Sequence, residues 1–160
     1  MFLCSIRMSK IKIFAVFAVI LAVGIVSIVL LTSSSDSGEK TPEAMPPAEM
    51  MAAETNDQRV AFLEYFGWKV VIDPTEVAEV EIPSEFDEVY QNYNSIQKQQ
   101  GMDLETYKGK TVQRYAYLVT NYPDGKTNVF AHLLICDNLI IGGDVSSSEL
   151  DGFMHGFIKP

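Results

Sequence analysis

The chain has 160 residues, 48% of them hydrophobic, and a formal net charge of −9. This length allows one ordinary domain with short appendages. All 21 acidic residues follow residue 35, together with only nine basic residues, and this acidic balance excludes a basic face for nucleic acid or for an anionic lipid surface.

An uncharged apolar segment of 19 residues covers positions 13–31. As a helix it would be about 28 Å long, close to the hydrocarbon thickness of a bilayer. The charged residues before it are all basic: Arg7, Lys10 and Lys12. Because positive charge stays on the cytoplasmic side, we expect a cytoplasmic flank over residues 1–12, a single-pass membrane anchor over residues 13–31, and an extracytoplasmic C-terminal part.

The apolar segment is longer than the core of an ordinary signal peptide and no clear Ala-x-Ala site follows it, so we expect an uncleaved anchor. The small residues at 32–35 leave cleavage open. Residues 32–55 are rich in Ser, Pro and Glu without apolar periodicity, which predicts a flexible tether. Cys4 and Cys136 would lie on opposite sides of the membrane, so the extracytoplasmic domain, residues 56–160, is expected to fold without a disulfide.

The folded part is predicted to open with a helix, for which Asn56 or Asp57 is a suitable N-cap and Gly67 a suitable stop. Its apolar residues recur at helical spacing. Two strands are expected next. The first is the apolar, β-branched segment 68–73, and the second is the alternating segment 77–82.

The clearest helix follows Pro83, with Ser84 as its expected N-cap and Gly101 as its end. Acidic residues fill its first turn and Lys98 lies near its C-terminus, as the helix dipole favours. Its apolar stripe is predicted to pack against a sheet. The stripe consists of Phe86, Val89, Tyr90, Tyr93 and Ile96.

The C-terminal half is predicted to be a meander of three strands, over residues 110–122, 127–136 and 139–145. Asp124-Gly125 indicates a hairpin turn, and Asp137-Asn138 a second one, because these residues tolerate left-handed backbone. Gly142-Gly143 indicates a bulge or a close backbone approach. A short helix is expected over residues 148–157.

This order of elements predicts an α+β fold with helices on one face of an antiparallel sheet. The whole chain is thus expected to consist of an N-terminal transmembrane helix and a small domain whose antiparallel sheet packs against two main helices.

The sequence contains no Gly-rich phosphate loop, no Gly-x-Ser-x-Gly, no His-Glu-x-x-His and no Cys-x-x-Cys. No catalytic residue, metal or cofactor is therefore predicted. His132 and Cys136 lie four residues apart on one expected strand, about 13 Å from each other, which excludes a Cys–His nucleophile from this pair alone. Cys136 is expected to be a small buried hydrophobe.

Two groups of polar residues are candidate sites. The first runs from the second helix into its loop and could bind a sugar or a peptide backbone, or equally cap the strands beneath it: Tyr93, Asn94, Gln97, Gln100 and Asp103. The second could form a metal or acid–base site if the C-terminal tail folds back: His132, Asp144 and His155.

Several short strings, in order, carry a family resemblance: Tyr93–Leu104, Tyr107–Lys110, Asn121–Pro123, Ile141–Val145 and Gly152–Gly156. Over residues 59–157 the chain resembles an uncharacterised family of proteins from Gram-positive bacteria that carries a domain of unknown function. Members of this family usually have one anchor and one outer domain. The resemblance implies a location in the cell envelope and no assigned activity.

The leading functional hypothesis is a membrane-tethered extracytoplasmic binding or interaction module, whose partner is an envelope protein or a wall ligand. The alternative is an envelope hydrolase or metal-dependent enzyme, which requires His132, Asp144 and His155 to converge. A third hypothesis is self-association of the membrane helix through Ala18 and Ala22, which have the small-xxx-small spacing.

Overall fold

The computed structural model describes residues 46–160, so the predicted anchor over 13–31 and most of the predicted tether lie outside the described residues. Within residues 46–160, no helix has the length and hydropathy that crossing a bilayer requires.

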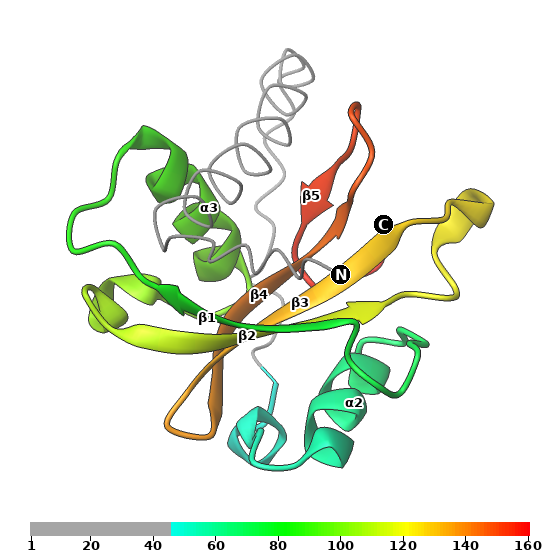
Figure 1. Ribbon diagram of the computed structural model, residues 1–160, viewed down its shortest axis with the longest axis horizontal. Helices are drawn as coiled ribbons and strands as arrows, with labels where there is room; N and C mark the ends of the chain where they lie inside the picture. Colours follow the sequence, from blue (N-terminus) through cyan, green and yellow to red (C-terminus); the bar gives the residue numbers. More distant parts are fainter. Residues whose placement is uncertain (1–45) are drawn as a thin grey trace, which may run out of the picture.

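The described residues form an α+β domain around one five-stranded antiparallel sheet, in the order β1-β2-β3-β4-β5 (Figure 1). Consecutive strands are neighbours throughout, so the sheet is a simple meander. The strands are β1 (Glu76–Glu81), β2 (Thr111–Leu118), β3 (Val129–Cys136), β4 (Leu139–Ser147) and β5 (Met154–His155). The helices are α2 (Asn56–Tyr65) and α3 (Glu88–Gln99), with short 3-10 helices η1 (Ala48–Met51), η2 (Leu104–Tyr107) and η3 (Pro123–Gly125). The fold class predicted for the domain is confirmed.

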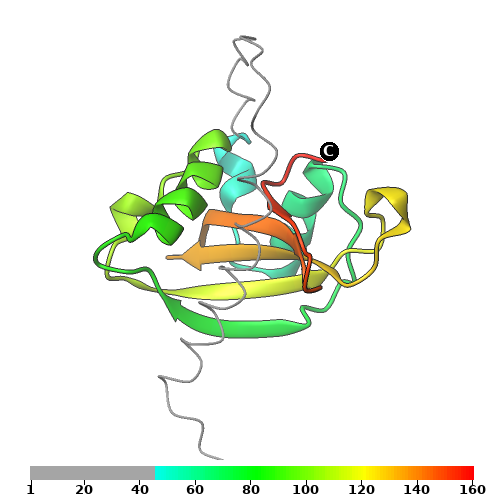
Figure 2. The same ribbon diagram turned by 90° about the horizontal axis from the view of Figure 1, so that it is seen from above.

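The two main helices lie on opposite faces of the sheet, which corrects the prediction that both lie on one face. Phe62 of α2 belongs to one apolar cluster together with Leu133 of β3, whereas Tyr93 of α3 belongs to a second cluster together with Leu134. Adjacent residues of a strand point to opposite faces. Figures 1 and 2 show this arrangement, with α3 and α2 on different sides of the strands. The reason is that residues 133–136 are an unbroken apolar run, typical of a strand covered on both sides.

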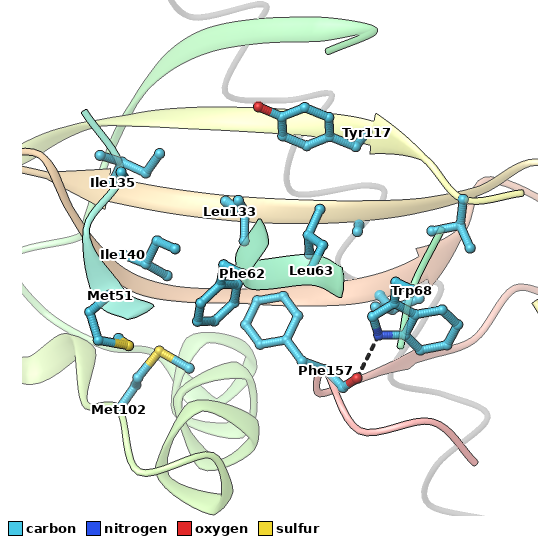
Figure 3. Packing of buried hydrophobic residues seen from close by; sticks show 14 of the residues in the cluster. Met51, Phe62, Leu63, Trp68, Met102, Tyr117, Leu133, Ile135, Ile140 and Phe157 are labelled. Carbon is cyan, nitrogen blue, oxygen red and sulfur yellow. Dashed lines mark hydrogen bonds between the residues drawn. The ribbon is translucent and has the colours of Figure 1, made fainter. Parts of the chain in front are cut away.

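The apolar cluster that contains Phe62, which we call the α2 cluster or α2 core, is the larger of the two (Figure 3). It includes residues that the composition assigns to the tether: Met51 and Ala53 are buried, and the N–H of Ala53 donates to the carbonyl of Asn138 over 2.8 Å. The folded domain therefore begins before residue 56. Helix α2 is capped by Thr55, whose hydroxyl accepts from the N–H of Gln58 in a capping box, and not by Asn56 or Asp57.

Helix α3 also begins later than predicted. Its N-cap is Asp87, whose carboxylate accepts from the N–H of Tyr90 over 2.8 Å, whereas Ser84 lies outside the helix. Phe86 remains outside as well, yet its ring packs on that of Tyr90 at 4.6 Å. A carboxylate is as good a cap as a hydroxyl and adds negative charge at the positive end of the helix, so the later start is stable.

Two elements predicted from local pattern are absent from the described structure. Residues 68–73 make a single β-bridge, Val70 to Val119, instead of a strand. The N–H of Lys69 donates to the side-chain oxygen of Asn121 and not to the backbone of a neighbouring strand. The segment 148–157 forms a turn and the two-residue strand β5 instead of a helix. Its last residue, Phe157, is fully buried against α2, and this tertiary contact overrides helical propensity.

The two predicted turns are confirmed, with different lengths. Asp137 and Asn138 have φ angles of 51° and 62° and join β3 to β4 tightly. Asp124 and Gly125 also have positive φ, but they belong to a longer connection that contains η3 and is closed where the N–H of Val119 donates to the carbonyl of Val129.

Strand β4 contains the bulge that its glycines indicate. The register passes from Ile135–Ile140 to Leu134–Gly142, which leaves Ile141 as the extra residue. Gly143 then has a φ of +155°, and a Cβ at this position would overlap the backbone carbonyl of His132 and approach the Phe157 ring. Only glycine fits there.

Gly143→Ala is expected to lower the free energy of unfolding by more than about 3 kcal/mol, because the overlap with backbone can be relieved only by shifting β3 or β4. Urea denaturation of the full-length chain in detergent, followed by Trp68 fluorescence, measures this. The matched control is Gly109→Ala, where φ is +73° and no atom lies within 4 Å of the added Cβ. That substitution should cost only about 1–2 kcal/mol. Equal losses at the two positions would contradict the close approach at Gly143.

Candidate functional site

A histidine and a buried carboxylate face each other across strands β3 and β4. His132 and Asp144 are direct cross-strand partners, and Nδ1 of His132 lies 3.0 Å from Oδ1 of Asp144. The histidine side chain is 19% exposed and the aspartate side chain 5%. A carboxylate only accepts hydrogen bonds, so Nδ1 carries the proton. No described residue hydrogen-bonds to Nε2, the ring nitrogen on the edge away from Asp144.

The charge on Asp144 is held by donors from three elements. The hydroxyl of Tyr93 in α3 donates to Oδ2 over 3.1 Å. Burial by itself would raise the pKa of the Asp144 carboxyl, but the neighbouring His132 and hydrogen bonds from His132, Ser146 and Tyr93 outweigh it and leave the pKa below its usual value. Burial, and then the charge of Asp144, raise the pKa of Tyr93 well above its ordinary range, so the phenol keeps its proton.

This arrangement orients an imidazole but does not assemble a serine hydrolase. The hydroxyl of Ser146 lies 3.4 Å from Nδ1 of His132, which is the nitrogen already bound to Asp144. In a Ser-His-Asp triad the serine must instead meet Nε2. What the pair offers is a fixed hydrogen-bond acceptor at Nε2, supported by a buried carboxylate.

The first predicted group of site residues is buried and bonded internally. Gln97 is fully buried, and its Oε1 accepts from the N–H of Gly143 over 2.8 Å. Gln100, 7% exposed, donates from Nε2 to the carbonyl of Gly143 over 3.1 Å and accepts from the N–H of Phe157 over 2.6 Å. The two amides thus satisfy both backbone groups of Gly143 and fix the C-terminal tail.

Asn94 and Asp103 order the loop after α3 in the same way. The amide of Asn94 donates to Asp103 over 2.9 Å, and its oxygen accepts from the N–H of Leu104 over 2.8 Å. The hydrogen bond from Asn94, followed by that from the N–H of Glu105, lowers the pKa of Asp103. Of the five predicted ligand residues, therefore, all have partners inside the domain. Their contacts are those of side chains that cap the strands and loops beneath them. Ligand binding by these residues stays a prediction.

The second predicted group is only partly brought together. His155 lies in β5 opposite Val145, which packs in the α2 core, whereas Asp144 contacts α3. The ring of His155 stacks on Phe153 and bonds to the hydroxyl of Tyr122 over 3.1 Å. Among residues 46–160, no three His, Cys, Asp or Glu side chains are placed to hold a metal ion. His155 thus lies on the opposite face of the sheet from His132 and Asp144, and catalysis by these three residues stays a prediction.

Cys136 is buried at 9% exposure beside α3, as expected of a small apolar side chain. Burial, and then the charge of Asp137, raise the pKa of its thiol, which keeps it protonated and unreactive.

Sequence reasoning missed the apolar neighbours of His132. Phe130 and Leu118 are cross-strand partners on β3 and β2, and strand alternation places both on the same face as His132. Both are partly buried, and neither belongs to the two apolar clusters of the described domain. The available signal was the spacing of Phe130 and His132, two residues apart on one strand.

Gln100→Ala is expected to reduce the free energy of unfolding by about 2–4 kcal/mol, because it leaves the carbonyl of Gly143 and the N–H of Phe157 buried without partners. Gln99→Ala is the matched control, since Gln99 is exposed and is the last residue of α3, directly before Gln100. It should change stability by less than about 0.5 kcal/mol. Urea denaturation compares them, and a Gln100 effect no larger than the Gln99 effect would contradict the bonding described.

Tyr93→Phe is expected to cost about 2 kcal/mol near neutral pH, because buried Asp144 loses a donor. The pKa of Asp144 is depressed in the fold, so its stabilising contribution is present above 3.8, its ordinary pKa, and is lost as the pH falls through the folded pKa. The difference between variant and parent should therefore shrink as the pH falls below 3.8. Tyr65→Phe, at an exposed tyrosine, is the control. A difference independent of pH would show that Tyr93 does not act on the charged carboxylate.

No curated protein and no solved structure matches the chain. The family model described as Domain of unknown function (DUF4830) matches residues 62–145, more than half of the chain. The match includes α3, β1 to β3 and β4 as far as Val145, with His132 and Asp144, and ends before β5 and His155. It confirms the domain of unknown function in the resemblance and leaves the anchor and the bacterial group as expectations. The chain belongs to the DUF4830 family.

Proposed function

We propose that the chain is a membrane-tethered module that binds a protein partner outside the cytoplasm. The tether and the location rest on the charge-free segment 13–31 and its basic flank. The binding role rests on one structural observation, an apolar patch beside an oriented imidazole on a sheet face that α3 covers only in part.

We call this patch the open half of the sheet; it consists of Leu118, Phe130 and His132. Pairing between β2 and β3 and the alternation of side chains along each strand place these residues on the face that α3 packs against. Helix α3 covers Leu134 and Cys136 nearer the other end of β3. Figure 1 shows α3 over that end, while α2 lies on the opposite face. Leu118 and Phe130 therefore keep part of their apolar surface unpacked by either core.

The chemistry of the open half favours a partner that brings an apolar side chain and a hydrogen-bond donor. Phe130 and Leu118 offer apolar contact, and the rings of Phe130 and His132 are stacked with centroids 6.4 Å apart. Nε2 of His132 offers a directed acceptor. Aromatic side chains at the centre of a contact contribute most to protein recognition.

A protein surface fits this patch better than a small wall fragment does. Small ligands generally occupy concave sites of about 300–1,000 Å³. The hollow between α3 and the C-terminal tail measures about 140 Å³, and its lining includes none of the residues of the open half. The face of a sheet instead offers an extended surface for contact with a protein.

In-cell photocrosslinking tests the proposal. A photoreactive phenylalanine analogue replaces Phe130 in the full-length chain, and the same analogue replaces Tyr65, an exposed aromatic on α2, as the matched control. We expect a single dominant adduct from position 130, recovered with the membrane fraction, and none of that size from position 65. His132→Ala should weaken the adduct, because the directed acceptor is lost.

Two outcomes would overturn the proposal. Adducts of the same pattern from both positions would show contact without specificity for the open half. Absence of any adduct at position 130 in cells that retain the protein in their membranes would remove the binding face, whatever the anchor does.

A further inference from the structure

The C-terminal tail closes the larger core from outside the sheet. Strand β5 pairs only two residues with β4, and the chain then turns inward at Phe157. The Phe157 ring is fully buried and meets Phe62 at 5.0 Å, edge to face (Figure 3). Its carbonyl accepts from the indole N–H of Trp68 over 2.5 Å. The tail is thus joined to the sheet by only two paired residues of β5, and Phe157 anchors it in the α2 cluster.

His155 precedes Phe157 by two residues, and its hydrogen bonds suit a neutral ring. One nitrogen, Nδ1, lies 2.6 Å from the carbonyl of Gly156, so it donates. The other, Nε2, lies 3.1 Å from the hydroxyl of Tyr122 and can accept from it. A protonated imidazole has donors on both nitrogens, and the tyrosine hydroxyl would then have to turn away its own proton.

The surroundings of His155 are aromatic and poorly suited to a charge. Its ring stacks on Phe153 at 5.5 Å and lies 6.1 Å from Trp68 and 5.9 Å from Tyr122. Burial lowers the pKa of His155, although the carbonyl of Gly156 and the charge of Asp144 act in the other direction.

The charged groups on the neighbouring elements include two lysines. Lys126, after η3, lies 4.8 Å from the centre of the Phe153 ring, and Lys159 lies 4.8 Å from that of Trp68. Asp124 adjoins Tyr122 on the same connection, and Asp144 lies on β4. The turn before β5 carries two exposed carboxylates: Glu149 and Asp151. The cations that touch the aromatic rings around His155 thus oppose a further positive charge.

We propose that residues 153–157 form a pH-operated latch, in which protonation of His155 loosens the tail from Trp68 and Tyr122 and lets Phe157 leave the α2 core. The pKa of His155 is lower in the closed tail than the ordinary histidine pKa of 6.5. The neutral ring therefore favours the closed tail fully above pH 6.5, and this advantage is lost as the pH falls below that value. Mild acidification therefore opens the latch. The open half of the sheet lies on the other face, so this inference stands independently of the proposed binding role.

The composition of the chain makes the test direct, because it has one tryptophan and two histidines. Acrylamide quenching of Trp68 fluorescence in the full-length chain reports exposure of the indole when the tail opens. Between about pH 7.5 and about pH 5, where histidines titrate, we expect the quenching constant to rise by about twofold or more. His132→Gln should retain the rise, and His155→Gln should give a constant value across this range.

Imidazole NMR of the parent protein supplies a second measurement that needs no variant to fold. One of the two histidine signals should titrate below 6.5, in step with the rise in quenching. Quenching that does not change with pH, or that follows the signal lost in His132→Gln, would overturn the latch. So would a pH-dependent rise that persists in His155→Gln.

Discussion

Gln97 of α3 and Gln100, the residue that caps the C-terminus of this helix, link α3, strand β4 and the C-terminal tail. Gln97 and Gln100 hydrogen-bond to the N–H and the carbonyl of Gly143 in β4, and Gln100 also accepts from the N–H of Phe157 in the tail. A buried backbone group without a partner costs as much as a lost hydrogen bond, so these contacts decide where β4 can lie. They require a residue without Cβ at position 143, because β3 and the Phe157 ring press against it.

The position of β4 then decides where a charge can be buried. Asp144 follows Gly143 and points toward α3, where Tyr93 and His132 donate to its two oxygens. Removing a carboxylate from water is costly, and only this complete set of donors makes the site stable. The consequence is a histidine with one nitrogen fixed and the other directed away from its partner. The open half of the sheet therefore gains its directed acceptor from the same packing that places α3.

The two histidines show how environment separates identical side chains. His132 is hydrogen-bonded to a buried carboxylate, whereas His155 is hydrogen-bonded to a carbonyl and a phenol among aromatic rings. Burial acts on both, but only His132 has an anionic hydrogen-bond partner. A charge on His155 would weaken the tail, because burial among these rings disfavours the protonated form. Their roles in binding and in the latch differ for this reason.

The sequence by itself determined the α+β class, the antiparallel meander, the tight Asp137-Asn138 turn and the bulge near Gly142, because these follow from local periodicity and backbone preference. It also located the polar side chains that matter, without their roles. Only the tertiary structure decided that the helices take opposite faces, that Phe157 enters the core instead of forming a helix, and that His155 lies apart from His132 and Asp144. These choices depend on contacts between residues distant in the chain, and a pattern read along the chain does not contain them.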